Sequence, residues 1–339
     1  NTNTITWTAV TDASRYHVYK SENGMFGYIG WTSSTSFTDN NIDADTLQAP
    51  PEDQSHLLSS TDNYPGAVTY FEQRRVFAGT NNEPQNIIMT RSATESNLTR
   101  SVPIRHSDAI NISVKGMGTI RHLVSVTDLI SLASNNTSNI TTKDSDHLTY
   151  ENIWPRYLDG SSGANHLRPI VARDTILFGE SMGSHIAEMY FGENSRYATR
   201  DISVLANHLV DGYSLVDWAF MRTPYPIVWA VRSDGVLLSL TYLPDRTAQH
   251  QGILAWTRHT TDGAFESVAV IPESNGEEKL YAVTKRTING ATKRFIERMK
   301  NRRIDDIRDA FFVDCGLTYS GSAVTTITGL SHLEGKEVA

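Results

Sequence analysis

Pairs of apolar segments, each pair joined by a short polar turn, recur along most of this chain. In PIVWAVRSDGVLLSLTYL, residues 226–243, two apolar runs flank Asp234-Gly235. Asp-Gly favours a two-residue β-hairpin, because the backbone of such a turn takes positive φ. A hairpin cannot bury both of its faces alone, so a chain of hairpins must stack them against one another. Similar pairs occur within residues 67–91, 119–134, 168–191 and 264–299.

The spacing of these pairs predicts repeated units of one size. The turns near Arg74, Asp128, Asp174, Asp234 and Gly276 are separated by 54, 46, 60 and 42 residues. A four-stranded propeller blade occupies about 40–50 residues. The sequence therefore predicts an all-β chain with a β-propeller-like platform domain of five to six blades at residues 56–310.

Three segments interrupt this pattern. Residues 131–150 and 151–166 are rich in Asn, Ser, Thr and Gly, which predicts exposed loops or insertions. Residues 294–312 fit either a helix with Phe295 and Met299 on one face or a strand followed by a charged loop.

Both ends of the chain differ from its middle. At 1–42, a Trp7 strand followed by Tyr-x-Val-Tyr resembles part of a fibronectin type III β-sandwich, and 43–55 is a polar, proline-containing linker. Residues 311–339 are predicted to begin a C-terminal β region that is truncated here. The absence of an initiating Met leads us to expect a fragment of a longer polypeptide.

Composition restricts the classes of function. The 339 residues carry a net charge of −8, which disfavours nonspecific binding to nucleic acid phosphates. A single cysteine, Cys315, rules out an intrachain disulfide and a zinc site built from cysteines, and it is predicted to be a small buried residue. No apolar stretch reaches the roughly 20 residues that a membrane helix needs.

The histidines do not suggest a metal site, because no two of them are spaced i, i+4 or as His-x-His. They lie at positions 17, 56, 106, 122, 147, 166, 185, 208, 250, 259 and 332.

GESMGSH, residues 179–185, has the Gly-x-Ser-x-Gly spacing of a hydrolase nucleophile elbow around Ser181. The elbow needs a helix after it, whereas HIAEMYF favours a strand, so we predict a hairpin turn. A triad with His208 and either Asp201 or Asp211 stays as a minor alternative.

Acidic residues near the turns suggest a second catalytic alternative. Propeller glycosidases use two or three carboxylates, and Asp108, Asp128, Asp174 and Asp217 are the candidates. Aspartates are equally common in tight hairpins. No GxGxxG or GxxxxGK[ST] motif supports a nucleotide site.

Two further groups of side chains suggest binding. Arg74-Arg75 and the cluster from Lys300 to Arg303 are candidate phosphate contacts, although Asp305, Asp306 and Asp309 neutralise the second cluster. Trp154, Trp218, Trp229 and Trp256 are candidate sugar platforms, but their positions in strands favour core packing.

Several collinear segments together resemble one protein family. They are YPGAVTYFEQRRVFAGT, NEPQNIIMTRS, RHLVSVTDLISLAS, RPIVARDTILF, RDISVLANHL, VDWAF, PIVWAVRSDGVLLSLTYL, AWTRHTTDGAFESVAVIP, DAFFVDCGLTYSG and TTITGLSHLEGKEV. This combination resembles the tail hub or nozzle proteins of short-tailed bacteriophages. That group includes the packaged-DNA stabilisation proteins and is similar to the tail tubular protein B family. The resemblance runs from about Ile5 to the last residue.

The resemblance implies a structural role in the virion. Proteins of this family form a ring, a hexamer, below the portal and tail adaptor protein, and carry tailspikes or tail fibres and a tail needle or plug. They retain packaged DNA, which passes through the channel without sequence-specific binding, until ejection. The expected location is the phage tail, after synthesis in the bacterial host cytoplasm.

We therefore predict no enzymatic activity, no catalytic, cofactor-binding or metal-binding residues, and no cofactor. The alternative hypothesis is a β-propeller glycan hydrolase or a glycan-binding tail module.

Overall fold

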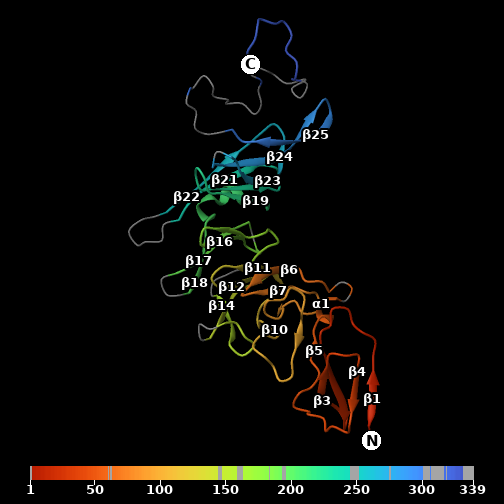
Figure 1. Cartoon of the computed structure of the whole chain (residues 1–339). Coiled ribbons are helices and arrows are strands. Elements are labelled where there is room, and N and C mark those ends of the chain that lie inside the picture. Colours follow the sequence, from red (N-terminus) through yellow and green to blue (C-terminus); the bar gives the residue numbers. More distant parts are fainter. Residues whose placement is uncertain are drawn as a thin grey trace. The chain divides into compact units, whose positions relative to one another are not determined.

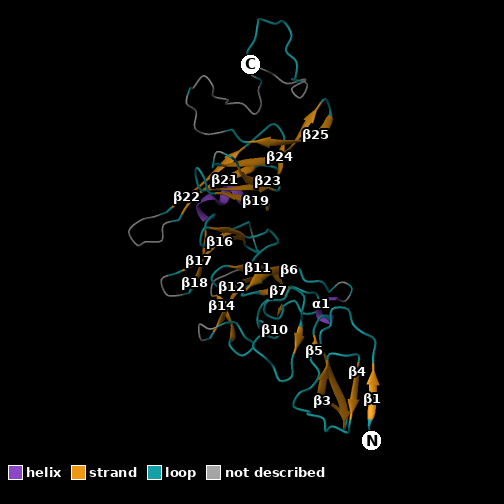
Figure 2. Ribbon diagram, viewed as in Figure 1, coloured by secondary structure: helices purple, strands orange, loops and turns teal. Residues whose placement is uncertain are grey.

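Strands make up nearly all the regular structure of the chain (Figure 2). The computed structural model describes residues 2–59, 61, 63–143, 147–158, 163–182, 184–192, 196–244, 252–274, 276–300, 306, 317 and 319–330. The chain divides into two compact units, Asn1–Gly163 and Ala164–Ala339 (Figure 1). The prediction of an all-β chain is confirmed, and each unit is described by itself below.

The first unit begins with two small antiparallel sheets. β1 (Asn3–Thr6) pairs with β4 (Ser36–Asp39), and β2 (Tyr16–Glu22) pairs with β3 (Met25–Thr32). Asn23 and Gly24, both with positive φ, form the turn of the second hairpin. Only Val18 and Ile29 are buried among the apolar residues of these four strands. The fibronectin type III interpretation of residues 1–42 remains a prediction.

The segment predicted as a linker makes contacts within the first unit. Asp45 forms an isolated bridge with Tyr28, and β5 (Glu52–Asp53) pairs with β9 (Thr99–Arg100). The short helix α1 (His56–Ser59) follows β5.

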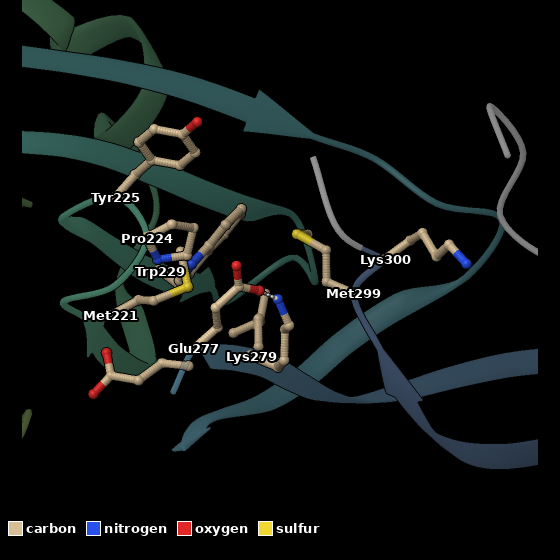
Figure 3. A pocket seen from close by; sticks show the side chains of 10 residues that line it. Met221, Pro224, Tyr225, Trp229, Glu277, Lys279, Met299 and Lys300 are labelled. Carbon is tan, nitrogen blue, oxygen red and sulfur yellow. Dashed lines mark hydrogen bonds and ion pairs between the residues drawn. The ribbon is translucent and has the colours of Figure 1, made fainter. Parts of the chain in front are cut away.

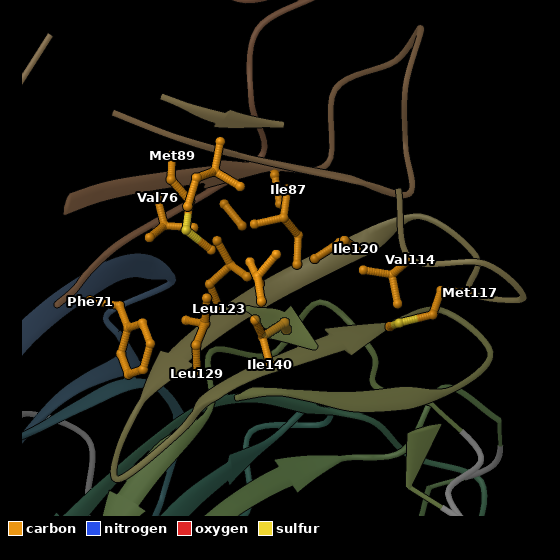
Figure 4. Close-up of a cluster of buried hydrophobic side chains, with 14 of the residues drawn as sticks. Phe71, Val76, Ile87, Met89, Val114, Met117, Ile120, Leu123, Leu129 and Ile140 are labelled. Carbon is orange, nitrogen blue, oxygen red and sulfur yellow. The ribbon is translucent and has the colours of Figure 1, made fainter. Parts of the chain in front are cut away.

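Two four-stranded antiparallel sheets form the rest of the first unit, in the orders β10-β8-β7-β6 and β11-β12-β13-β14. Buried apolar side chains of both sheets meet in one cluster (Figure 4). Val76, Ile87 and Met89 of the first sheet pack with Ile120 and Leu129 of the second. The bounds are β6 (Ala67–Phe71), β7 (Arg74–Ala78), β8 (Asn86–Met89), β10 (Ile110–Ser113), β11 (Ile120–Ser125), β12 (Leu129–Ala133), β13 (Thr137–Thr142) and β14 (Ile153–Leu158).

The prediction of exposed loops at 131–150 and 151–166 was wrong in part, because both contain a strand of the second sheet, β13 and β14. β13 buries Ile140 in the apolar cluster, but its other buried residues, Thr137, Ser138 and Asn139, are polar. The buried hydroxyls of Ser131 and Ser138 lie 2.7 Å apart on adjacent strands. Such pairing satisfies the groups that would otherwise make burial costly.

The second unit contains three further antiparallel sheets in chain order. The first two have four strands each, β15 to β18 and β19 to β22, and the third has three, β23 to β25. Their bounds are β15 (Ile170–Ala172), β16 (Thr175–Gly179), β17 (Ile186–Phe191), β18 (Tyr197–Asp201), β19 (Leu215–Met221), β20 (Ile227–Arg232), β21 (Leu237–Leu243), β22 (Ile253–His259), β23 (Ala264–Pro272), β24 (Glu278–Ile288) and β25 (Ala291–Arg298). The short helices η1 (Val204–Ala206) and α2 (Asn207–Val210) follow β18.

Successive sheets of the second unit pack against each other through apolar faces. Leu177 and Ile186 pack with Val228, and Trp229 packs with Val268 and Leu280 of the following sheet. A serial stack of four-stranded antiparallel sheets is the arrangement of propeller blades. The propeller-like fold class therefore stands, and the number of blades remains a prediction.

The repeat is more regular than the turns suggested. The second strands of the five large sheets begin at Arg74, Leu129, Thr175, Ile227 and Glu278, with spacings of 55, 46, 52 and 51 residues. The Asp234-Gly235 turn joins the second and third strands of its sheet, whereas the other turns chosen from the sequence join the first and second.

The helix considered at 294–312 is not formed in its described part. β25 runs to Arg298, as the alternative of a strand followed by a charged loop predicted. Of the remaining residues in that range, the structure describes only Met299, Lys300 and Asp306.

Candidate functional site

A cavity of about 180 Å³ lies between the last two sheets of the second unit (Figure 3). Its floor is apolar, because β19 and β20 supply Met221 and Trp229 while β24 supplies Leu280. Pro224 and Tyr225 of the β19–β20 turn form one wall, and Met299, directly after β25, forms another.

The polar groups of this cavity are bound to other parts of the chain. Lys279 is buried, and its Nζ lies 2.5 Å from Oε2 of Glu277. The carboxylate of Glu278 accepts hydrogen bonds from the backbone N–H groups of Arg222 and Thr223. The cavity therefore has the shape and polarity to hold a small apolar group beside an ion pair.

A second hollow, of about 320 Å³, lies where η1 and α2 meet β22. Trp256 lines it and donates its indole N–H to the carbonyl of Ile202, at 2.9 Å. Val204 and Leu205 at its edge are exposed, Leu205 to 93%.

A His–Asp–Ser constellation that sequence patterns did not reveal borders this second hollow. Nδ1 of His185 lies 2.8 Å from Oδ2 of Asp201, and Oδ1 of Asp201 accepts hydrogen bonds from the backbone N–H and hydroxyl of Ser203, both at 2.7 Å. The aspartate stands between the other two residues. A nucleophile needs the histidine next to the serine, so this arrangement lacks the order of a catalytic triad.

The structure places Ser181 in the turn between β16 and β17, as the hairpin hypothesis predicted. Gly179 pairs with Ile186, and the Glu180 N–H donates to the carbonyl of His185 at 3.0 Å. A strand therefore follows the turn where a nucleophile elbow needs a helix. His208, the imagined base, lies in α2.

The four candidate carboxylates lie in or next to four different sheets, and three of them, described below, bind groups of the chain itself. Asp128 accepts from Nδ2 of Asn139 at 3.1 Å, and Asp174 lies in the β15–β16 turn. Asp217 accepts from the N–H of Val268 at 2.9 Å and so connects β19 to β23. These contacts are typical of structural aspartates in turns and between sheets.

Asp108 is the most buried of the four. Its carboxylate accepts from the backbone N–H groups of Ser101 and Arg105 at 2.9 and 2.8 Å, and lies 3.1 Å from Arg91. Burial opposes ionisation, but the hydrogen bonds from Arg105 and Ser101 outweigh it and lower the pKa of Asp108 below its ordinary value.

Arg74, a candidate phosphate contact, is instead fully buried. Its guanidinium donates to the carbonyls of Thr90 and Asp108 at 2.7 Å each, and to that of His106 at 2.9 Å. Burial lowers the pKa of Arg74, and the carboxylates of Asp108 and Glu72 oppose that shift. The group is unavailable to phosphate.

Arg75, next in sequence, reaches the surface. It binds the Tyr70 hydroxyl and Glu95, at 2.7 Å each from Nη2. Lys300 lines the first cavity, and the rest of its cluster, at 301–303, lies outside the described residues.

Three of the four candidate tryptophans are packed in the second unit. Trp218 donates its indole N–H to the carbonyl of Arg168 at 2.6 Å, and Trp229 is fully buried against the ring of His259. Trp256 lines the second hollow as described. Trp154 on β14 is the exception, since 45% of it is exposed and Arg156 lies 4.8 Å above its ring.

In the described part of the chain, no group of three or more His, Cys, Asp and Glu side chains is placed to hold a metal ion. Cys315, His250 and His332 lie outside that part. No helix in the same described ranges is long and apolar enough to cross a membrane.

No model of a protein family and no curated protein matches the chain. Among solved structures, the chain is similar to the Cps50 (Swd1) β-propeller domain of Myceliophteria thermophila, with a TM-score of 0.40 and 7% sequence identity. The match covers 67% of this chain and 68% of that one. Function must therefore be argued from the residues of this chain.

Proposed function

We propose that this chain is a structural subunit of the tail hub or nozzle ring of a short-tailed bacteriophage, and that it is not an enzyme. The support from sequence is the set of collinear segments that resemble this family. The observation that carries the proposal is that candidate functional side chains bind other parts of the chain itself. Asp108, Asp128, Asp217 and Arg74 all hold turns and sheets in place, as a scaffold requires.

The same proposal includes the partners of the family. The ring, a hexamer in the family, would bind a portal or tail adaptor protein, a tailspike or tail fibre, and a tail needle or plug. Packaged DNA would pass through its channel without sequence-specific binding, which suits a chain with a net charge of −8. Its place would be the tail of the virion.

Light scattering of the chain with and without its tail adaptor ring tests this function. A closed complex with several copies of the chain per adaptor ring is expected, and electron microscopy of that complex would give the copy number. If the chain stays monomeric in the presence of the adaptor ring, at concentrations far above the usual dissociation constants of protein complexes, the proposal is wrong.

One observation favours a glycan-binding module as the second candidate. Trp154 and Tyr157 are both exposed on β14, the outermost strand of its sheet, and exposed aromatic rings stack on sugars. Retention of the protein on a polysaccharide column, abolished by Trp154→Ala but not by Trp31→Ala, would favour this function. Trp31 is a matched control because it is also exposed and also stacked by an arginine, Arg15.

A further inference from the structure

The cavity between the last two sheets contains a buried ammonium group with unused hydrogen-bond donors. Lys279, which lines this cavity, is only 6% exposed. Its ammonium group carries three N–H donors, and in the described chain only the carboxylate of Glu277 accepts from it. A buried donor without an acceptor costs free energy unless water or a ligand supplies one. The cavity therefore presents a donor to any acceptor that enters it.

The apolar lining beside this ammonium group is suited to an aromatic ring. Met221, Trp229 and Leu280 form a floor in which no residue is more than 7% exposed. Figure 3 shows Met299 on the other side of the cavity from Met221. Thioether sulfur atoms make favourable contacts with aromatic rings, and flexible Met side chains adjust to the shape of what they bind.

The volume of the cavity sets the size of a ligand. An apolar cavity of about 150 Å³ is large enough to bind benzene. This cavity, at about 180 Å³, has room for one six-membered ring with one or two small substituents. Tyr225, in its wall, is 51% exposed and the side chain of Glu277 is 38% exposed, so a ligand can reach the cavity from solvent.

The charges at the cavity favour a neutral ligand over an acid. Glu277 already balances Lys279, so a ligand carboxylate would bring a second negative charge next to that of Glu277. Figure 3 shows Nζ of Lys300 pointing away from this pair. An unbalanced charge is unfavourable in a partly buried site. A neutral acceptor such as a hydroxyl takes one unused N–H of Lys279 and leaves the ion pair intact.

We propose that this cavity binds a neutral, single-ring aromatic compound with one hydrogen-bond acceptor, such as a phenol. The ring packs on Trp229 between the side chains of Met221 and Met299, and the hydroxyl oxygen accepts from Nζ of Lys279. The site is independent of the proposed ring assembly, because all the residues that line it belong to the second unit of one copy.

NMR of the methionine methyl groups tests the site, with p-cresol as the probe. The signals of Met221 and Met299 are assigned with Met221→Leu and Met299→Leu. The ring current of p-cresol should shift these two signals and leave those of Met25 and Met182, which are exposed elsewhere on the chain, unchanged. Equal shifts of all four signals would show nonspecific association. That result, or no shift of Met221 and Met299, would overturn the proposal.

Two related probes test the class of ligand without any change to the protein. Toluene has the same ring without an acceptor, and it should bind about 10- to 100-fold more weakly than p-cresol because it cannot accept from the ammonium group. Benzoate should also bind more weakly than p-cresol, because its carboxylate is repelled by Glu277. If either compound binds as tightly as p-cresol, the proposed class of ligand is wrong.

Lys279→Met removes the donor and keeps an apolar side chain of similar length. It should reduce the affinity for p-cresol about 10- to 100-fold, to that for toluene, and leave the affinity for toluene unchanged. Lys293→Met, on an exposed position of β25, is the matched control and should bind p-cresol as the native chain does. A Lys279→Met chain that distinguishes p-cresol from toluene as well as the native chain does would show that this ammonium group is not the donor.

Discussion

Replacing Arg74 by alanine should destabilise the first unit more than any surface change near it. The guanidinium satisfies two buried carbonyls, of Thr90 and Asp108, at 2.7 Å and a partly buried one, of His106, at 2.9 Å. It also lies 3.5 Å from the carbonyl of Leu148 in the loop between β13 and β14. Each buried acceptor left without a donor costs about 1–3 kcal/mol. Relaxation and entry of water reduce the sum, so we expect a loss of about 3–5 kcal/mol in the free energy of unfolding.

Arg75→Ala is the control, because the neighbouring arginine makes an exposed pair with Glu95 that is worth about 0.2–1 kcal/mol. Arg74→Lys should recover only part of the loss, since one ammonium cannot match the fork of the guanidinium. In urea, with a slope of about 3 kcal/mol per molar, Arg74→Ala should lower the unfolding midpoint by about 1–1.7 M.

Hydrogen exchange of residues 86–113 assigns the lost stability to the first unit. Amides near Thr90, His106 and Asp108 should lose protection in Arg74→Ala and keep it in Arg75→Ala. A midpoint shift no larger than that of Arg75→Ala would show that the buried guanidinium is not the connection we infer.

Three further predictions concern the second unit. Glu188→Ala should lower the free energy of unfolding by about 2–3 kcal/mol, because buried Glu188 accepts from the Tyr242 hydroxyl at 2.7 Å and pairs with Arg200. The control Glu95→Ala should change it by less than about 1 kcal/mol in the same urea titration. Gly235→Ala should lower the free energy of unfolding by about 1–3 kcal/mol more than Gly276→Ala. Both glycines have positive φ, but only the new methyl group at 235 would lie 2.4 Å from Cβ of Ala264. Equal melting temperatures of the two variants would contradict this. Hydrogen bonding by Arg298, with Tyr281, lowers the pKa of Glu273 to about 2, so its ionised form stabilises the fold above pH 4.5 and this contribution disappears as the pH falls towards 2. The difference in melting temperature between the native chain and Glu273→Gln should therefore be constant near neutral pH and vanish in acid, and a difference that is unchanged at pH 2 would exclude this pair as its source.

The strands and hairpins could be predicted from sequence where the inward residues are apolar. The Asp234-Gly235 turn and the strand after GESMGSH were recognised because β-branched and apolar residues alternate with clear turn residues. β13 was missed because its buried residues include Ser138 and Asn139, one on each face, whose polar groups bind Ser131 and Asp128. Hydropathy cannot detect a side chain whose hydrogen-bond partner lies on another strand.

The roles of charged residues were harder to predict than the strands. Arg74 and Arg75 are adjacent and chemically identical, yet one is fully buried and the other is half-buried at the surface, because successive residues of a strand point to opposite faces. On β7, Arg74 shares a face with Val76 and Arg75 shares the other face with Phe77. Each face therefore combines one arginine with one apolar residue, and the sequence does not indicate which guanidinium faces the core. The His185–Asp201–Ser203 contacts were also invisible, since they join two strands through a register that only the fold defines.

The indole rings of the second unit give the molecule an optical property of its own. Trp218 and Trp256 are each fixed by a hydrogen bond to a loop carbonyl, and Trp229 is fully buried between the last two sheets. Buried indoles emit at shorter wavelengths than hydrated ones, so separation of these sheets would shift the intrinsic fluorescence to the red. In the other unit Trp31 and Trp154 are already exposed, and only Trp7, packed on Tyr16, is partly buried. Three of the four shielded indoles therefore belong to the second unit, and a red shift of the emission would mainly report when that unit comes apart.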